Sequence, residues 1–193
     1  MSRELSEHEH WLLSYYRTSE ISGAQFFGKL AQSMRPSPLQ MNLTRHFADE
    51  SVHAWEWTQC IARFGRMPLR LGCAYQDRYA AVAGLPINLM EVLCLTLVFE
   101  KRVIKQYALH RRAAALQEPV RRTLARIIRD ERWHISWVRK ALGEMEHRFG
   151  RERIEETIAL YRRADREVYR STLHEHRDRV EGLRDLMENG GRI

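Results

Sequence analysis

Hydrophobic residues recur every three or four positions along most of the chain, a spacing typical of the buried face of an α-helix. Five helical stretches can be delimited on this pattern. The first is expected from about Glu4 to Ala31, because the "RPSP" at 35–38 contains two prolines, through which a helix does not continue. No stretch shows a competing strand pattern, so the sequence predicts an all-α fold.

The second helix has a clear start signal. Ser37 is expected to be its N-cap, Pro38 its first residue and Gln40 the partner in a capping box. Gly65 is expected to end this helix. Residues 66–87 contain two prolines and two glycines and are too long for a tight turn, so we expect them to cross over along the bundle.

The third helix is expected to start after Asn88 as its cap, with Glu91 in a capping role, and the fourth to run from Pro119 to about Leu142. A further helix is predicted over about 151–188. Four long helices with one long crossover between the second and third favour a ferritin-type four-helix bundle over a simple up-down bundle. We therefore expect a single domain over 1–193, with its bundle core at about 5–143 and the long C-terminal helix added to it.

Composition and charge narrow the class of protein. The net charge is +7, and 32 − 4 = 28 of the basic residues are arginine. The arginines are interleaved with acids, which favours ordinary solvated helix faces, with a nucleic-acid partner as the alternative. The three cysteines form no C-x-x-C pair, which excludes a zinc ribbon or a rubredoxin-type iron centre and favours a reducing compartment. Neither a signal peptide nor a membrane span is predicted, so we expect a cytoplasmic protein.

The pattern Asp-Glu-x-x-His occurs twice, as "DESVH" at 49–53 and as "DERWH" at 130–134. Residues i and i+3 of a helix point to nearly the same side. Glu50 and His53 should therefore project together, and so should Glu131 and His134. One such pair on a charged helix is common by chance and is usually solvated, but two copies, each with an Asp before the Glu, indicate a metal site.

Each pair is expected to be completed by a glutamate of the preceding helix. Glu20 and Glu100 lie among apolar residues at helical spacing, where a bare carboxylate is costly to bury. The spacings 50 − 20 = 30 and 131 − 100 = 31 describe two similar halves; Glu91, the other candidate, fits its capping role instead. Four glutamates would neutralise two divalent cations, and oxygen-rich ligation with two imidazoles suits iron or manganese.

Neighbouring residues have more than one interpretation. Asp49 and Asp130 can each reach the ligand histidine of the opposite half or be solvated helix acids. Tyr16 and Tyr107 can hydrogen-bond a ligand, relay an electron or simply pack in the core. His46, one turn before Glu50, is expected to be a packed or exposed histidine rather than a ligand.

The six ligand candidates resemble the site of the ferritin-like di-iron carboxylate superfamily over about residues 5–143, and the doubled Asp-Glu-x-x-His is similar to that of bacterioferritin and the rubrerythrins. The long fifth helix departs from bacterioferritin, and the chain lacks the paired cysteines of a rubredoxin domain. Its length and the third-helix stretch "LVFEKRVIKQY" are more similar to the small di-iron oxygenases, which include aldehyde-deformylating oxygenases and tRNA-modifying hydroxylases.

The resemblance implies a di-iron oxidoreductase that activates O2 to oxidise or hydroxylate a small organic molecule, with an external electron donor; Mn/Fe and Mn/Mn are the alternative metal pairs. It implies one metal on Glu20, Glu50 and His53 and the other on Glu100, Glu131 and His134, with glutamates that bridge. Phe27, Leu97 and Ile104 would line a substrate pocket or be packed shut. The alternative functions are a ferroxidase, a peroxide scavenger or an iron store, and a homodimer is also open. A metal-free helical interaction module would require the four glutamates to be solvated.

Overall fold

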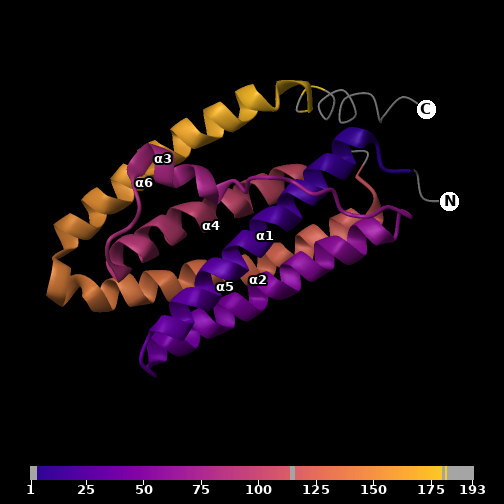
Figure 1. The fold of residues 1–193 in the computed structure, drawn as a ribbon. Coiled ribbons are helices and arrows are strands. Elements are labelled where there is room, and N and C mark those ends of the chain that lie inside the picture. The colour runs from indigo at the N-terminus through magenta and orange to yellow at the C-terminus, as the bar shows by residue number, and fades with distance from the viewer. Residues whose placement is uncertain (1–3, 114–115, 180, 182–193) are drawn as a thin grey trace.

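The computed structural model describes residues 4–113, 116–179 and 181, and all regular elements within these residues are helices (Figure 1). The all-α prediction is therefore confirmed for this part of the chain. The elements, in chain order, are α1 (Glu7–Ser33), α2 (Pro38–Ala62), the 3₁₀-helix η1 (Gln76–Arg78), α3 (Tyr79–Ala83), α4 (Leu89–Arg111), α5 (Glu118–Phe149) and α6 (Arg151–Glu175).

The caps of α2 and α4 set where these helices begin. The Ser37 hydroxyl accepts a hydrogen bond from Gln40 N at 3.1 Å, and Asn88 Oδ1 accepts one from Glu91 N at 3.0 Å, as predicted. The Glu91 carboxylate completes its cap by accepting a hydrogen bond from Ile87 N at 3.0 Å. The capping box predicted for α2 is wrong, because the Gln40 amide donates to the Ala31 carbonyl instead.

The connection between α2 and α4 follows α1 and holds two short helices, η1 and α3, that the sequence did not predict. It is attached to α1 by side chains of α1. Ser14 Oγ accepts a hydrogen bond from Leu69 N at 3.0 Å, and Ser22 Oγ donates one to Asp77 at 2.8 Å. Gly84, whose φ of 75° suits a residue without Cβ, ends α3.

The four long helices α1, α2, α4 and α5 pack around a shared interior, in which α1 lies on α2, α4 on α5, and α2 on α5. α5 continues to Phe149, seven residues beyond the predicted end at Leu142, and Gly150, with φ 80°, starts α6 at once. α6 packs back on α3, α4 and α5. Residues 182–188 of the predicted C-terminal helix lie outside the described residues.

Two apolar clusters occupy the interior, and the glutamates lie between them. On α1, Leu13 belongs to one cluster and Phe27 to the other, with Glu20 midway. On α2, Leu43 and Trp57 flank Glu50 in the same way. α4 and α5 repeat the arrangement around Glu100 and Glu131. The polar residues are therefore enclosed by apolar layers above and below, which exclude water from them.

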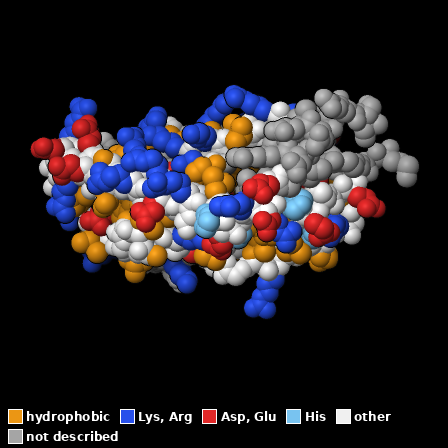
Figure 2. Space-filling view, turned by 90° about the horizontal axis from the view of Figure 1, so that it is seen from above, with side chains coloured by type: hydrophobic (Ala, Val, Ile, Leu, Met, Phe, Trp, Pro, Cys, Tyr) orange, Lys and Arg blue, Asp and Glu red, His pale blue; other side chains and the backbone are white. Residues whose placement is uncertain are grey.

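The face that carries α6 is densely charged (Figure 2). α6 exposes six arginines and five glutamates along its length, so the basic side chains are interleaved with acids there, as the sequence pattern indicates. Arg151 and Glu155, for example, pair at 2.8 Å. Among the described helices, none is both long enough and apolar enough to cross a membrane.

Candidate metal centre

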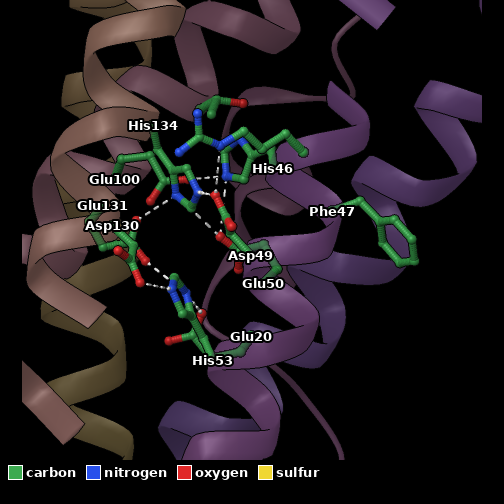
Figure 3. Close-up of polar contacts among 12 residues, drawn as sticks. Glu20, His46, Phe47, Asp49, Glu50, His53, Glu100, Asp130, Glu131 and His134 are labelled. Carbon is green, nitrogen blue, oxygen red and sulfur yellow. Dashed lines mark hydrogen bonds and ion pairs between the residues drawn. The ribbon is translucent and has the colours of Figure 1, made fainter. Parts of the chain in front are cut away.

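The structure brings the six predicted ligand residues together in the interior (Figure 3). α1 contributes Glu20 and α4 contributes Glu100. α2 and α5 each contribute a glutamate and a histidine, which project side by side because they are three residues apart on a helix. None of the six is more than 4% exposed: Glu20, Glu50, His53, Glu100, Glu131 and His134.

Together with His46, these six residues form two groups that share Glu50. In the first group, Glu20, Glu50, His53 and Glu131 each offer one ligand atom, and these atoms lie within 4.8 Å of one another. In the second group, His46, Glu50, Glu100 and His134 do the same. Each group combines carboxylate oxygens with at least one imidazole, so both buried clusters could hold a metal ion.

Glu131 belongs to the first group but lies close to the histidines of both groups. Its Oε1 is 3.3 Å from His53 Nδ1, and its Oε2 is 2.9 Å from His134 Nδ1. Glu50 occupies the matching position on α2, with Oε1 3.5 Å from His134 Nδ1. Both glutamates of the repeated motif thus lie where the bridging glutamates implied by the resemblance would lie.

His46 is packed in the interior, one of the two alternatives expected from the sequence, and it also belongs to a candidate metal group that sequence reasoning did not include. It is fully buried, not exposed, and its Nε2 lies 3.2 Å from Glu50 Oε1 and 3.1 Å from Glu100 Oε1. Its ring is stacked between Phe27 and His134, at centroid distances of 3.8 and 3.7 Å. The available signal was its position one helical turn before Glu50, which places it on the same face of α2.

Asp49 and Asp130 lie at the outer sides of the two histidines. Asp49 Oδ2 is 3.4 Å from His134 Nε2, and Asp130 Oδ2 is 3.5 Å from His53 Nε2. Each aspartate thus reaches the histidine of the opposite helix, while the other ring nitrogen of that histidine faces the glutamates. Carboxylates in this position orient a ligating imidazole.

The two tyrosines differ in their contacts. The Tyr107 hydroxyl donates a hydrogen bond of 2.5 Å to Glu20 Oε1. Tyr16 packs against Tyr107 at 4.6 Å and against Trp57 at 5.3 Å. Phe27 and Leu97 are packed in the core, so of the two predictions for these side chains, closed packing fits better than a substrate pocket.

Burial and crowding perturb the acids strongly. Burial, reinforced by the neighbouring carboxylates, raises the pKa of both Glu50 and Glu100 well above the usual range. Burial would also raise the pKa of Glu131, but His134 and His53 outweigh it and lower that pKa well below the usual range. Burial opposes a charged His53, yet Glu131 and Glu20 raise its pKa to about 11.

His46 carries the opposite perturbation. Burial, with the nearby His134, lowers the pKa of His46 well below its usual range, so its imidazole is neutral. A neutral imidazole has a lone pair on one ring nitrogen and is the form that ligates a metal.

Several buried polar atoms of these clusters lack a hydrogen bond of good geometry, which suits residues that could hold a cation. Among the described residues, both Glu100 oxygens and His53 Nδ1, the ring nitrogen that faces the glutamates, are buried without a hydrogen bond of good geometry. Such atoms are costly to bury unless something pairs with them. Gly23 adds a shape constraint, because a Cβ at this position would come 2.7 Å from Glu50 Oε2. Comparison of the chain with protein-family models, curated proteins and solved structures found no match.

Proposed function

We propose that the protein is a ferritin-like dinuclear metal oxidoreductase that uses O2 to oxidise or hydroxylate a small organic substrate. The observation that carries this proposal is the pair of buried carboxylate–imidazole groups that share Glu50. Four glutamates in an apolar interior are sustainable if two divalent cations neutralise them. Two iron ions suit the ligand set, with Mn/Fe or Mn/Mn as alternatives.

In this proposal, one metal is held by Glu20, Glu50, His53 and Glu131, and the other by His46, Glu50, Glu100 and His134. When bound and reduced, the metal pair would pass two electrons to O2, so that one oxygen atom enters the substrate and the other leaves as water with two protons; an external donor would then return two electrons to the metals.

The chain's own residues position and shield this chemistry. Tyr107 holds Glu20 through its short hydrogen bond, and Asp49 and Asp130 lie where they would orient the rings of the two histidines. The two apolar clusters keep water from the carboxylates, which strengthens every electrostatic interaction between ligand and cation.

Metal analysis of the purified protein tests the proposal. Protein expressed with iron and manganese both supplied should contain about two metal ions per chain. Replacement of Glu131 by Ala should lower that content, because Glu131 contacts both histidines. Glu146→Ala, at an exposed position on the same helix, is the matched control and should leave it unchanged. Metal-free wild-type protein, or unchanged metal content in Glu131→Ala, would contradict the proposal.

Iron oxidation without an organic substrate is the second candidate, because the two metal groups by themselves suit a ferroxidase, a peroxide scavenger or a store equally well. Assembly separates the alternatives. A shell of many subunits in solution would favour storage, whereas a monomer or dimer that consumes O2 only in the presence of an organic compound would favour the oxygenase.

A further inference from the structure

A cavity of about 250 Å³ lies between α1, α4 and α6, with Tyr75 of the connection in its wall. Aromatic side chains dominate the lining, among them Trp11, Tyr15, Phe99 and Tyr169. An apolar cavity of about 150 Å³ is large enough to bind benzene. This cavity therefore has room for more than one aromatic ring, and its walls offer faces against which rings stack.

The lining offers no free charge to a ligand. No carboxylate is among the described residues that line the cavity. The guanidinium of Arg102 lines it but is already paired, with Nε 3.1 Å from both Asp165 oxygens and the group 4.3 Å from the Tyr169 ring. Burial lowers the pKa of His110 to about 4, so this imidazole is neutral. A charged ligand would be buried without a partner, which is costly, so the lining favours a neutral one.

Three polar atoms of the wall are buried without a hydrogen bond of good geometry among the described residues: Tyr15 Oη, His110 Nδ1 and Thr172 Oγ1. His110 lines the cavity and is only 5% exposed, and among the described residues its Nδ1 has no hydrogen-bond partner. Buried ring nitrogens normally have a partner. A ligand that carries one hydroxyl or amide can supply it.

The cavity adjoins the metal centre through Tyr107. This side chain lines the cavity and also donates the 2.5 Å hydrogen bond to Glu20 Oε1. Tyr16, which also lines the cavity, packs on Tyr107 at 4.6 Å. A single side chain thus contacts both the cavity and a proposed metal ligand.

We propose that this aromatic cavity is the substrate site, and that it takes a neutral, mostly apolar compound of about two fused rings with one hydrogen-bonding group. The assignment of the ligand as substrate rests on the proposed function, whereas the binding itself does not. It can therefore be tested in metal-free protein as well as in metal-loaded protein.

The probe is 1-naphthol, a neutral two-ring compound whose fluorescence reports binding. We expect saturable binding of one molecule per chain, with or without metal. 1-Naphthoate and protonated 1-naphthylmethylamine have the same rings with a negative or a positive charge, and each should bind at least about tenfold more weakly because its charge finds no partner. Absence of saturable 1-naphthol binding, or equal binding of either ion, would overturn the proposal.

Cavity-filling variants locate the bound probe. Leu173→Trp fills the cavity from α6, away from the metal ligands, and should weaken 1-naphthol binding at least about tenfold, while Ser171→Trp, exposed on the same helix, should not. Leu12→Trp fills it from α1 and serves as a second variant if Leu173→Trp does not fold, as judged by circular dichroism. Wild-type affinity in a folded cavity variant would refute the site.

Metal content measured on the same samples separates the two proposals. Naphthol binding that Leu173→Trp abolishes, in protein that binds no metal, would support the cavity and defeat the proposed function. Protein that binds two metals per chain but no naphthol would support metal binding in the proposed function and defeat the cavity proposal. A naphthol-dependent increase in O2 consumption, lost in Leu173→Trp, would support both.

Discussion

The two ends of the candidate metal centre share a pattern of carboxylates and imidazoles but differ in the residues that surround it. At one end, Glu20 accepts a hydrogen bond from the Tyr107 hydroxyl at 2.5 Å. At the other end, Glu100 accepts no hydrogen bond of good geometry from the described residues, and His46 Nε2 lies 3.1 Å from it. One lone glutamate is thus held by a phenol and the other is approached by a neutral imidazole that can itself ligate.

The difference can be traced to equivalent positions of the two halves. Tyr107 follows Glu100 by 107 − 100 = 7 residues, and Phe27 follows Glu20 by 27 − 20 = 7. His46 precedes Glu50 by four residues, and the equivalent residue before Glu131 is Ile127, by 131 − 127 = 4. At the Glu100 end, His46 approaches the glutamate and stacks on Phe27. At the Glu20 end, Tyr107 belongs to an apolar cluster that contains Ile127. The halves share their candidate ligands, whereas the supporting residues differ.

The largest effect is expected from a change that acts on both ends at once. Gly23→Ala would place a Cβ 2.7 Å from Glu50 Oε2, so the shared glutamate must move. We expect both metal positions to be weakened by about 100-fold, the upper range for changes that reposition a ligand. A cobalt(II) titration followed by visible absorption would measure the two positions.

Gly143→Ala is the matched control for this change. A Cβ at position 143 of α5 meets nothing within 4 Å. Because alanine favours a helix over glycine by about 1 kcal/mol, this variant should be slightly more stable and bind metal normally. Wild-type metal affinity in Gly23→Ala would show that the Glu50 position is not constrained as we describe.

A smaller effect, confined to one end, is expected for His46→Leu. Loss of the imidazole should weaken the position on the Glu100 side by about 10- to 100-fold and leave the Glu20 side nearly unchanged. Ile127→Val, at the equivalent residue of the other half, should cost about 1 kcal/mol of stability without a change in metal binding. Equal weakening of both positions in His46→Leu would remove the distinction between the ends.

The His46 example shows how far sequence reasoning reaches. The candidate ligand pairs on α2 and α5 follow from the local sequence, because a spacing of three residues on a helix fixes the relative direction of two side chains. The repeated motif was enough to predict them. A lone histidine one turn away is equally compatible with core, surface or site, since only the packing of α1, α4 and α5 decides what it faces. The hydrogen bond from Tyr107 to Glu20 depends likewise on the placement of α4 beside α1.

In the fold, too, locally encoded features could be predicted, whereas features set by tertiary contacts could not. Caps such as Ser37 and Asn88 are encoded within four residues and were predicted. The short helices η1 and α3 were not, because they lie in a segment whose prolines and glycines indicate a loop and are stabilised by contacts with α1 and α6. The end of α5 was set too early: the helix continues through Gly143, which directly follows the predicted end at Leu142, and stops only at Gly150.

A rise in pH should lower the stability of the metal-free fold and raise the metal affinity. The folded-state pKa values of Glu50 and Glu100 are raised above 4.5, and that of His53 is raised from 6.5 to about 11. Between the unfolded and folded values the metal-free fold holds more protons than the unfolded chain, so its stability falls as pH rises. Each such group costs at most about 1.4 kcal/mol per pH unit above its unfolded value.

Metal binding must displace these protons, so metal affinity should rise with pH over the same range. Thermal melts between about pH 6.5 and 8.5 check both statements. The melting temperature should fall with pH in protein kept metal-free by a chelator, and the increase produced by metal should grow. A metal-free protein whose stability rises across this window would show that the carboxylates are not held protonated.

The smallest effect is expected at the Glu20 end. Tyr107→Phe removes the hydroxyl that holds Glu20 Oε1 but keeps the ring that packs on Tyr16. We expect about a tenfold loss of metal affinity at the Glu20 side, the low end for a residue that orients a ligand, with the Glu100 side unchanged. Tyr16→Phe keeps the same packing and gives up no described hydrogen bond, so it should bind metal as the wild type does. If Tyr107→Phe instead weakened the Glu100 side, the phenol would not be the counterpart of His46, and the two ends would be coupled through the shared Glu50.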